Sequence, residues 1–571
     1  MTLAVSLAAL LTLRAVLVIP GSMGGWGFSL LRFGPPFLSW ALWMLGAVLL
    51  IPPIGRRAMP TPPTRRVRGA AMWIALGLAA AVAGWPDRLH FVGDFLLREG
   101  TAARSLSPAG LFPQALPLDV FLHYGLPRAL ADAWSVPTAV TERTLGALEA
   151  AAIGVLALGF ARALRMEGAQ AVTIALVTAC GGFLGIYTGY GKAIAEMTLL
   201  TLAMGVFALR ALQTPRWLLA VGLTAAIGLV LHRSALALLP VAGLAVGMVW
   251  RAHPRAWRDP WVAAGLLAAV ITAAVMLPRI VTAMRQFDPV HFTPLERGPG
   301  GALGALVAPT RLLDLVNVIG LQSPLAPVIP GVAFALGIRK LATTTGAILA
   351  ALALPWIGMT ALIHPPQGMF RDWDNYSAAG VALSMIAAWL VVESAASKGS
   401  WRGLSLAAAM AAVGPSLTWL ALEADADRGL QRIHAYLSEP PHRSDVERGR
   451  VWDFLGIRNA QLGRWDASAE AMAKAAETSP SPRVLLQWAL AEQARGRASV
   501  ARDLFRRVTE MTPGDARAWY GLAAESWNLG DYEECRRATL GLEHAAPGSP
   551  EARQLLQSLD QVGRPDGASP R

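Results

Sequence analysis

The ionisable residues that could carry chemistry lie in short polar segments between long apolar runs. The longest of these segments, residues 84–124, opens with Asp87, His90 and Asp94 directly after an apolar run. A carboxylate in this position could act as a general base that takes a proton from a hydroxyl group. Structural roles compete, because Asp94 could instead cap a helix that begins at Phe95, and His90 could be an ordinary surface histidine. Asp94 and Asp87 are therefore the candidate bases of this segment.

Three later polar segments carry the other candidates. They are Lys192 with Glu196, His232 with Arg233, and Arg371 with Asp372 and Asp374. Ionisable residues beside membrane spans are costly, so they are functional candidates by default. Lys192, Arg233 and Arg371 could bind an anionic leaving group. Simpler roles compete here too, because Lys192 and Glu196 could pair with each other and the two arginines could extend to lipid headgroups.

The elements that must position these residues are membrane-spanning helices. The chain has 571 residues, of which 54% are hydrophobic and 15% charged, and its mean hydropathy is +0.44. Soluble domains carry about 25% charged residues. Repeated apolar runs of about 17–22 residues are long enough to cross a bilayer. Lipid offers no hydrogen-bond partner to backbone N–H and C=O groups, so such runs should be helical. We therefore expect an all-α, polytopic bundle of about thirteen spans.

The charge distribution predicts how this bundle is oriented. Residues 1–422 hold 30 Lys and Arg against 16 Asp and Glu, whereas residues 423–571 hold 20 against 22. With thirteen spans the basic loops fall on one side, which the positive-inside rule assigns to the cytoplasm. The basic excess therefore needs no nucleic-acid partner. We expect a bacterial inner-membrane protein with a cytoplasmic N-terminus, whose candidate residues and C-terminal tail lie outside.

The tail predicts a soluble α-solenoid. Glycines and prolines recur at intervals of 33 and 34 residues, at Gly463, Gly496 and Gly530 and at Pro480, Pro513 and Pro547. This spacing resembles the tetratricopeptide repeat (TPR), in which two helices are joined by a turn. Stacks of such pairs present a concave surface that binds peptide or protein, so we expect a protein partner or acceptor there.

Residues 69–421 resemble the GT-C superfamily of membrane glycosyltransferases, the group of the protein mannosyltransferases, aminoarabinose transferases and oligosaccharyltransferase subunits. Three features carry the resemblance: Val92-Gly-Asp94 in a large first outer loop, the return Leu116-Pro-Leu-Asp-Val-Phe-Leu-His-Tyr124, and later outer loops with Lys192, Arg233 and Arg371. The chain departs from the family in two ways. Asp87 and Asp94 are not an adjacent acidic pair, and two extra spans precede the core.

The resemblance implies a sugar donor on a polyprenyl phosphate, used at the outer face with inversion at the sugar carbon. Asp94 matches as the base, with Asp87 as the second choice, and Lys192, Arg233 and Arg371 would bind the donor phosphate. The supporting residues would be His90, Glu196, His232, Asp372 and Asp374. No cofactor is certain. A divalent metal, Mg²⁺ or Mn²⁺, held by Asp87, His90 and Asp94 stays open, although their spacing is no recognised metal pattern.

These inferences divide the chain into five parts. They are residues 1–68 with two extra spans and a basic loop, the core 69–422 with its outer loop 86–137, a linker 423–450, the repeats 451–563, and a disordered tail 564–571.

Three other functions compete with the glycosyltransferase. A lipid-linked glycan ligase would depend on arginine and histidine more than on Asp94. A transporter or flippase predicts an internal repeat of spans, and none is visible. A non-catalytic scaffold would need only one span.

Overall fold

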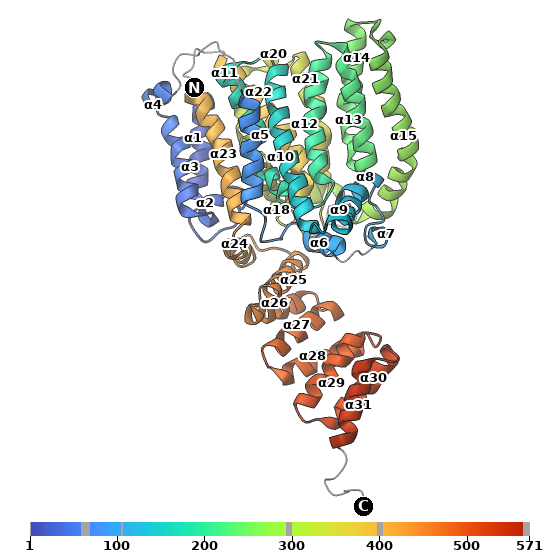
Figure 1. Ribbon diagram of the computed structural model, residues 1–571. Helices are drawn as coiled ribbons and strands as arrows, with labels where there is room; N and C mark the ends of the chain where they lie inside the picture. Colours follow the sequence, from blue (N-terminus) through green and yellow to red (C-terminus); the bar gives the residue numbers. More distant parts are fainter. Residues whose placement is uncertain (1, 59–68, 104–106, 293–299, 397–402, 563–571) are drawn as a thin grey trace, which may run out of the picture. The chain divides into compact units, whose positions relative to one another are not determined.

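Every regular element in the described part of the chain is a helix. The computed structural model describes residues 2–58, 69–103, 107–292, 300–396 and 403–562. The chain divides into two compact units, Met1–Pro441 and His442–Arg571 (Figure 1). The expected all-α class is thus confirmed. The predicted disordered tail, 564–571, lies outside the described residues.

The first unit is a bundle of long apolar helices. They are α1 (Thr2–Val16), α3 (Pro36–Leu49), α5 (Ala70–Gly84), α10 (Thr138–Ala163), α11 (Gly168–Ala179), α12 (Ile194–Ala211), α13 (Leu218–Leu231), α14 (Leu239–Ala252), α15 (Pro260–Phe287), α18 (Pro309–Gln322), α19 (Ile329–Leu336), α21 (Thr344–Leu362), α22 (Ser377–Ala396) and α23 (Gly403–Glu423). Their apolar side chains pack inside the bundle or face outward, as expected where lipid replaces water.

Seven helices in the described ranges are long and apolar enough to cross a membrane. An eighth span results if α18 and the helix after it, which are bent by 112° at a short break, are counted together. Five further apolar helices are shorter, among them α5 and α11. A multi-pass membrane protein follows from these helices. The number thirteen stays a prediction.

Short helices collect at one end of this bundle. They are α6 (Phe95–Ala103), α7 (Pro108–Leu111), α8 (Pro117–Val120) and α9 (Leu126–Trp134), with a π-helical turn, η1 (Phe121–Gly125), between the last two. Figure 1 shows them at the end of the bundle opposite α4 (Pro52–Ala58) and α20 (Ile338–Leu341). All of them belong to the predicted outer loop, so this loop is a folded layer that closes one end of the bundle. We call this end the loop face.

The stretch 423–450, predicted as a linker, contains α24 (Ala426–Ser438), which belongs to the first unit. Arg432 on this helix is buried and donates a hydrogen bond to the carbonyl oxygen of Trp26 at 3.1 Å. Its guanidinium also lies 4.6 Å from the ring centre of Phe370. The helix is therefore tied to the bundle through a buried cation.

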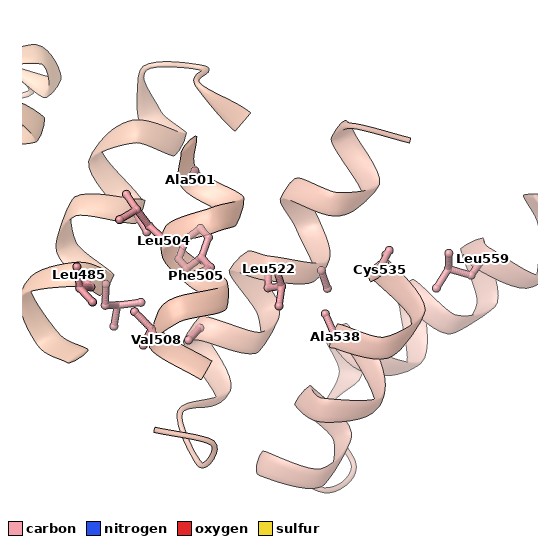
Figure 2. Packing of buried hydrophobic residues seen from close by; sticks show 13 residues of the cluster. Leu485, Ala501, Leu504, Phe505, Val508, Leu522, Cys535, Ala538 and Leu559 are labelled. Atoms are coloured by element: carbon pink, nitrogen blue, oxygen red, sulfur yellow. The ribbon is translucent and has the colours of Figure 1, made fainter. Parts of the chain in front are cut away.

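The second unit consists of consecutive antiparallel helices. They are α25 (Asp445–Gln461), α26 (Trp465–Thr478), α27 (Pro482–Ala494), α28 (Ala498–Met511), α29 (Ala516–Asn528), α30 (Tyr532–Ala545) and α31 (Pro550–Val562). Gly463, Gly496 and Gly530 sit in the turns within the first three pairs with φ of +71°, +73° and +75°. Phe505 and Leu522 lie in the core shared by neighbouring pairs (Figure 2). The recurring turn explains the glycine spacing, and its assignment as TPR stays a prediction.

Candidate active site

Three polar segments that are far apart in the sequence meet at the loop face. The ammonium of Lys192 donates to a carboxylate oxygen of Asp374 at 2.7 Å and to the side-chain oxygen of Asn375 at 3.3 Å. The backbone N–H of Asp94 donates to the hydroxyl of Tyr190 at 3.3 Å. The predicted base, the predicted phosphate-binding lysine and two predicted supporting carboxylates therefore share one site.

Gly93 lets the Asp94 loop approach this close. Its φ is +43°, in the left-handed region that glycine adopts at little cost. A Cβ atom at this position would lie 2.9 Å from the hydroxyl oxygen of Tyr190 and 3.5 Å from one carboxylate oxygen each of Asp372 and Asp374. A side chain here would force either the loop or the hydroxyl of Tyr190 to shift. The glycine thus places the backbone before Asp94 against two buried carboxylates.

The two aspartates proposed as bases have different environments. Asp94 is partly exposed, and its carboxylate makes no hydrogen bond or ion pair within the described residues. It therefore does not cap α6. Asp87 is only 4% exposed, and one of its oxygens accepts hydrogen bonds from the backbone N–H groups of Leu89 and His90 at 2.7 and 2.9 Å. Asp87 thus has a structural role in its own turn, whereas the Asp94 carboxylate is available.

His90 belongs to the same turn as Asp87. Its ring stacks on Phe95 with centres 4.3 Å apart, and its Nδ1 lies 3.7 Å from a carboxylate oxygen of Glu99. In the described part of the chain, no group of three or more His, Cys, Asp or Glu side chains is arranged to hold a metal ion. The donors in Asp87, His90 and Asp94 do not converge, so these residues do not fit the divalent metal that the sequence left open.

Burial and neighbouring charges set the ionisation of this site. Burial lowers the pKa of Lys192, but the charges of Asp374 and Asp94 outweigh burial and raise its pKa above the usual value. Burial and the negative charge of Asp374 raise the pKa of Asp372 to about 7. Lys192 is therefore a permanent cation, whereas Asp372 exchanges a proton near neutral pH.

The raised pKa of Asp372 predicts a pH-dependent stability. Between the usual value of 3.8 and about 7, the unfolded chain loses this proton while the folded protein keeps it. The protein should therefore lose stability as pH rises through this window, by at most about 1.4 kcal/mol per pH unit. Asp372→Asn should lack this component. Thermal midpoints of both proteins in detergent from pH 4.5 to 7.5 test it, and a difference that does not change with pH would contradict the assignment.

The other predicted phosphate ligands already have partners. Arg371 donates from Nε to the carbonyl oxygen of Phe91 at 3.2 Å, which ties it to the Asp94 loop. Arg233 forms an ion pair with Asp288 at 2.7 Å. Burial and the positive charges of Arg233 and Lys192 lower the pKa of His232. Asp288 thus neutralises Arg233, and no contact within the described residues joins Arg233 to Lys192.

A second buried cluster, centred on His123, was not predicted. His123 lies in η1 between two glutamates, with Nδ1 3.2 Å from Glu142 and Nε2 3.1 Å from Glu196. Burial alone would lower the pKa of His123, but the charges of Glu196 and Glu142 raise it well above its usual value. A cavity of about 30 Å³ opens beside His123 and Glu142. The pairing of Glu196 with Lys192, one of the roles that the sequence left open, does not form, because Glu196 contacts His123 and Lys192 contacts Asp374.

Arg98 joins this cluster to the Lys192 site. Its guanidinium lies 3.5 Å from Asp119 and donates to the carbonyl oxygen of Gly191 at 3.0 Å. Asp119 in turn lies 4.0 Å from His123, one helical turn further on. The spacing of Asp119 and His123 was a signal in the sequence, because residues four apart share one helix face. We infer that the cluster holds the turn that carries Lys192.

Comparison with known proteins gives only distant structural likenesses. No protein-family model matches the chain, and no curated protein matches it. A crystal structure of the Archaeoglobus fulgidus oligosaccharyltransferase, tethered with an acceptor peptide, is similar at 14% identity with a TM-score of 0.34. The match covers 70% of this chain but only 59% of that one. A likeness this distant decides neither the fold family nor the activity of this chain.

Proposed function

We propose that the first unit is a GT-C-type glycosyltransferase that takes its sugar from a polyprenyl phosphate at the outer face of a bacterial inner membrane. The observation that carries this proposal is the Asp94 carboxylate, partly exposed and without a partner in the described residues, on the same face as the Lys192–Asp374 pair. An available base next to a fixed cation is what transfer from a lipid phosphate requires.

In the proposed reaction, the acceptor hydroxyl oxygen attacks the anomeric carbon of the sugar while the bond from that carbon to the phosphate oxygen breaks. Asp94 takes the proton of the hydroxyl group. The leaving polyprenyl phosphate keeps the bonding electrons, and Lys192 and Arg371 stabilise its charge. Attack opposite to the leaving group inverts the anomeric carbon. Arg233 is a third phosphate ligand that would divide its charge between the donor and Asp288.

The remaining residues have supporting roles in this proposal. Asp374 holds Lys192 in place, and Arg98 fixes the turn before it through Gly191. The repeated helix pairs of the second unit, interpreted as TPR, would bind a protein partner or acceptor.

Transfer of label tests the proposal. Membranes enriched in the full chain are incubated with radiolabelled polyprenyl-phosphate sugars and an extract of envelope acceptors, beside membranes that lack the protein. We expect label in the acceptor only when the chain is present. Arg371→Gln should lower transfer by about tenfold or more, because a charged hydrogen bond to the donor phosphate is lost. Arg128→Gln, which changes an arginine with a 58% exposed side chain, is the matched control and should retain the parent's rate.

The competing functions predict other results. Transfer of label only from a pyrophosphate-linked glycan would favour the ligase. An absence of transfer from every donor pool would refute the proposal and leave the transporter and scaffold functions to be tested.

A further inference from the structure

A large basic cavity lies at the end of α10 that is remote from Glu142. Its volume is about 680 Å³. The ends of α10 and α12 and the first turn of α11 line it, and three arginines, Arg162, Arg165 and Arg210, face a single acidic residue, Glu167. Such an excess of cations around one hollow is the usual environment of a bound anion.

The charge of the three arginines is not neutralised by any described residue. In the described ranges, none of their guanidinium groups forms a hydrogen bond or an ion pair with a protein group. Arg210 lies over the ring of Trp217 at 5.2 Å, which orients its guanidinium without cancelling its charge. Elsewhere in the first unit, Arg233 has Asp288 and Arg216 has Asp259 as partners. The cavity therefore offers unpaired charge.

The position of the cavity indicates which anion it meets. Glu142 lies near the first turn of α10 at the loop face, and Arg162 lies 20 residues further along the same helix. At 1.5 Å per residue the two are about 30 Å apart along the axis, which equals the thickness of the hydrocarbon core. The cavity therefore lies at the headgroup level of the opposite leaflet.

We propose that this cavity binds the phosphate headgroup of an anionic phospholipid in the leaflet opposite Asp94. Arginine binds phosphate oxygens with two parallel hydrogen bonds, and basic hollows between membrane helices bind such headgroups. The first turn of α11 adds partial positive charge from its backbone N–H groups. The proposal needs no enzymatic activity, so it stands or falls independently of the glycosyltransferase proposal.

Native mass spectrometry of the full chain in detergent tests the site, with phosphatidylglycerol and phosphatidylcholine of identical acyl chains as probes. The parent should retain phosphatidylglycerol preferentially. Changing Arg162, Arg165 and Arg210 together to Gln should weaken that retention by about tenfold or more and leave phosphatidylcholine unchanged. The matched control changes Arg251, Arg255 and Arg258 to Gln. It removes the same charge from residues that are exposed, as Arg162 and Arg165 also are, but that lie outside the cavity, and it should stay within about twofold of the parent.

Equal losses in both triple variants, or no loss in the first, would overturn the proposal. Inorganic phosphate is the second probe, and binding of phosphate that phosphatidylglycerol does not displace would assign the cavity to a soluble ligand instead. The single variant Arg165→Gly tests whether a loss of lipid binding results from misfolding. Arg165 has a φ of +59°, which glycine adopts with less strain, so this variant should fold at least as well as the parent. It should still lose about fivefold in phosphatidylglycerol retention.

Discussion

Asp94→Asn is expected to lower sugar transfer by about a hundredfold to ten-thousandfold, the usual contribution of a general base. Asparagine has the shape of aspartate but cannot accept the proton of the acceptor hydroxyl. The carboxylate of Asp94 makes no hydrogen bond or ion pair within the described residues, so the substitution removes no contact that stabilises the fold. Detergent-extracted yield and thermal midpoint should therefore match those of the parent.

Two variants make this result specific to Asp94. Asp132→Asn changes an aspartate of the same outer loop whose side chain is 74% exposed, and it should transfer sugar at the parent's rate. Asp87→Asn keeps a side-chain oxygen that can still accept the hydrogen bonds of Leu89 and His90. It should retain activity within about tenfold if Asp87 only supports its turn. If Asp94→Asn is as active as the parent, Asp94 is not the base, and the ligase becomes the better hypothesis.

The helical elements could be predicted from the sequence. A long apolar segment in lipid must form its backbone hydrogen bonds within itself, and only a helix does so. The sequence also predicted that the candidate residues share one end of the bundle, because the loops that carry them fall on the same side when the spans are counted. The structure places Asp94, Lys192 and Asp374 together, as that prediction requires. Their roles in catalysis stay a proposal.

The partners of these residues could not be predicted. The spacing of Lys192 and Glu196 favoured a pair on one helix, but α12 begins only at Ile194, so Lys192 lies in the turn before it. It pairs instead with Asp374, 182 residues away. Spacing predicts contacts only within one regular element, and contacts between segments depend on how the bundle packs.

His123 escaped prediction for a related reason. It follows a stretch rich in proline and leucine and has one acidic neighbour on its own helix face, Asp119. The glutamates that surround it, Glu142 and Glu196, come from α10 and α12, and in the sequence each has a basic residue nearby, Arg143 and Lys192, as a more obvious partner than His123. Charged residues at span ends can become partners even when they are far apart in the sequence, because burying each of them alone would be too costly.

Lys192→Met is expected to destabilise the first unit by about 3–5 kcal/mol, the usual cost of removing one partner of a buried ion pair. The side chain of Asp374 is 0% exposed and that of Lys192 15% exposed, so water cannot replace the lost ammonium. Asn375 offers its own side-chain oxygen to Lys192 and cannot neutralise the carboxylate. Denaturant unfolding in detergent micelles, followed by tryptophan fluorescence, measures the loss.

A double-mutant cycle separates the pair from the packing around it. Lys192→Met combined with Asp374→Asn should be less destabilising than the two single changes added together, by about 1–3 kcal/mol. The matched control is the exposed pair Arg128–Asp132, with side chains 58% and 74% exposed at 3.8 Å, where a cycle with Met and Asn should give a coupling below about 0.5 kcal/mol. Additive losses at Lys192 and Asp374 would mean that their charges are compensated by other groups. Coupling between Lys192 and Asp374, without coupling at the control pair, would show that Asp374 fixes the ammonium of Lys192 in the proposed phosphate site. The position of this ammonium would then depend on a loop 182 residues away in the sequence.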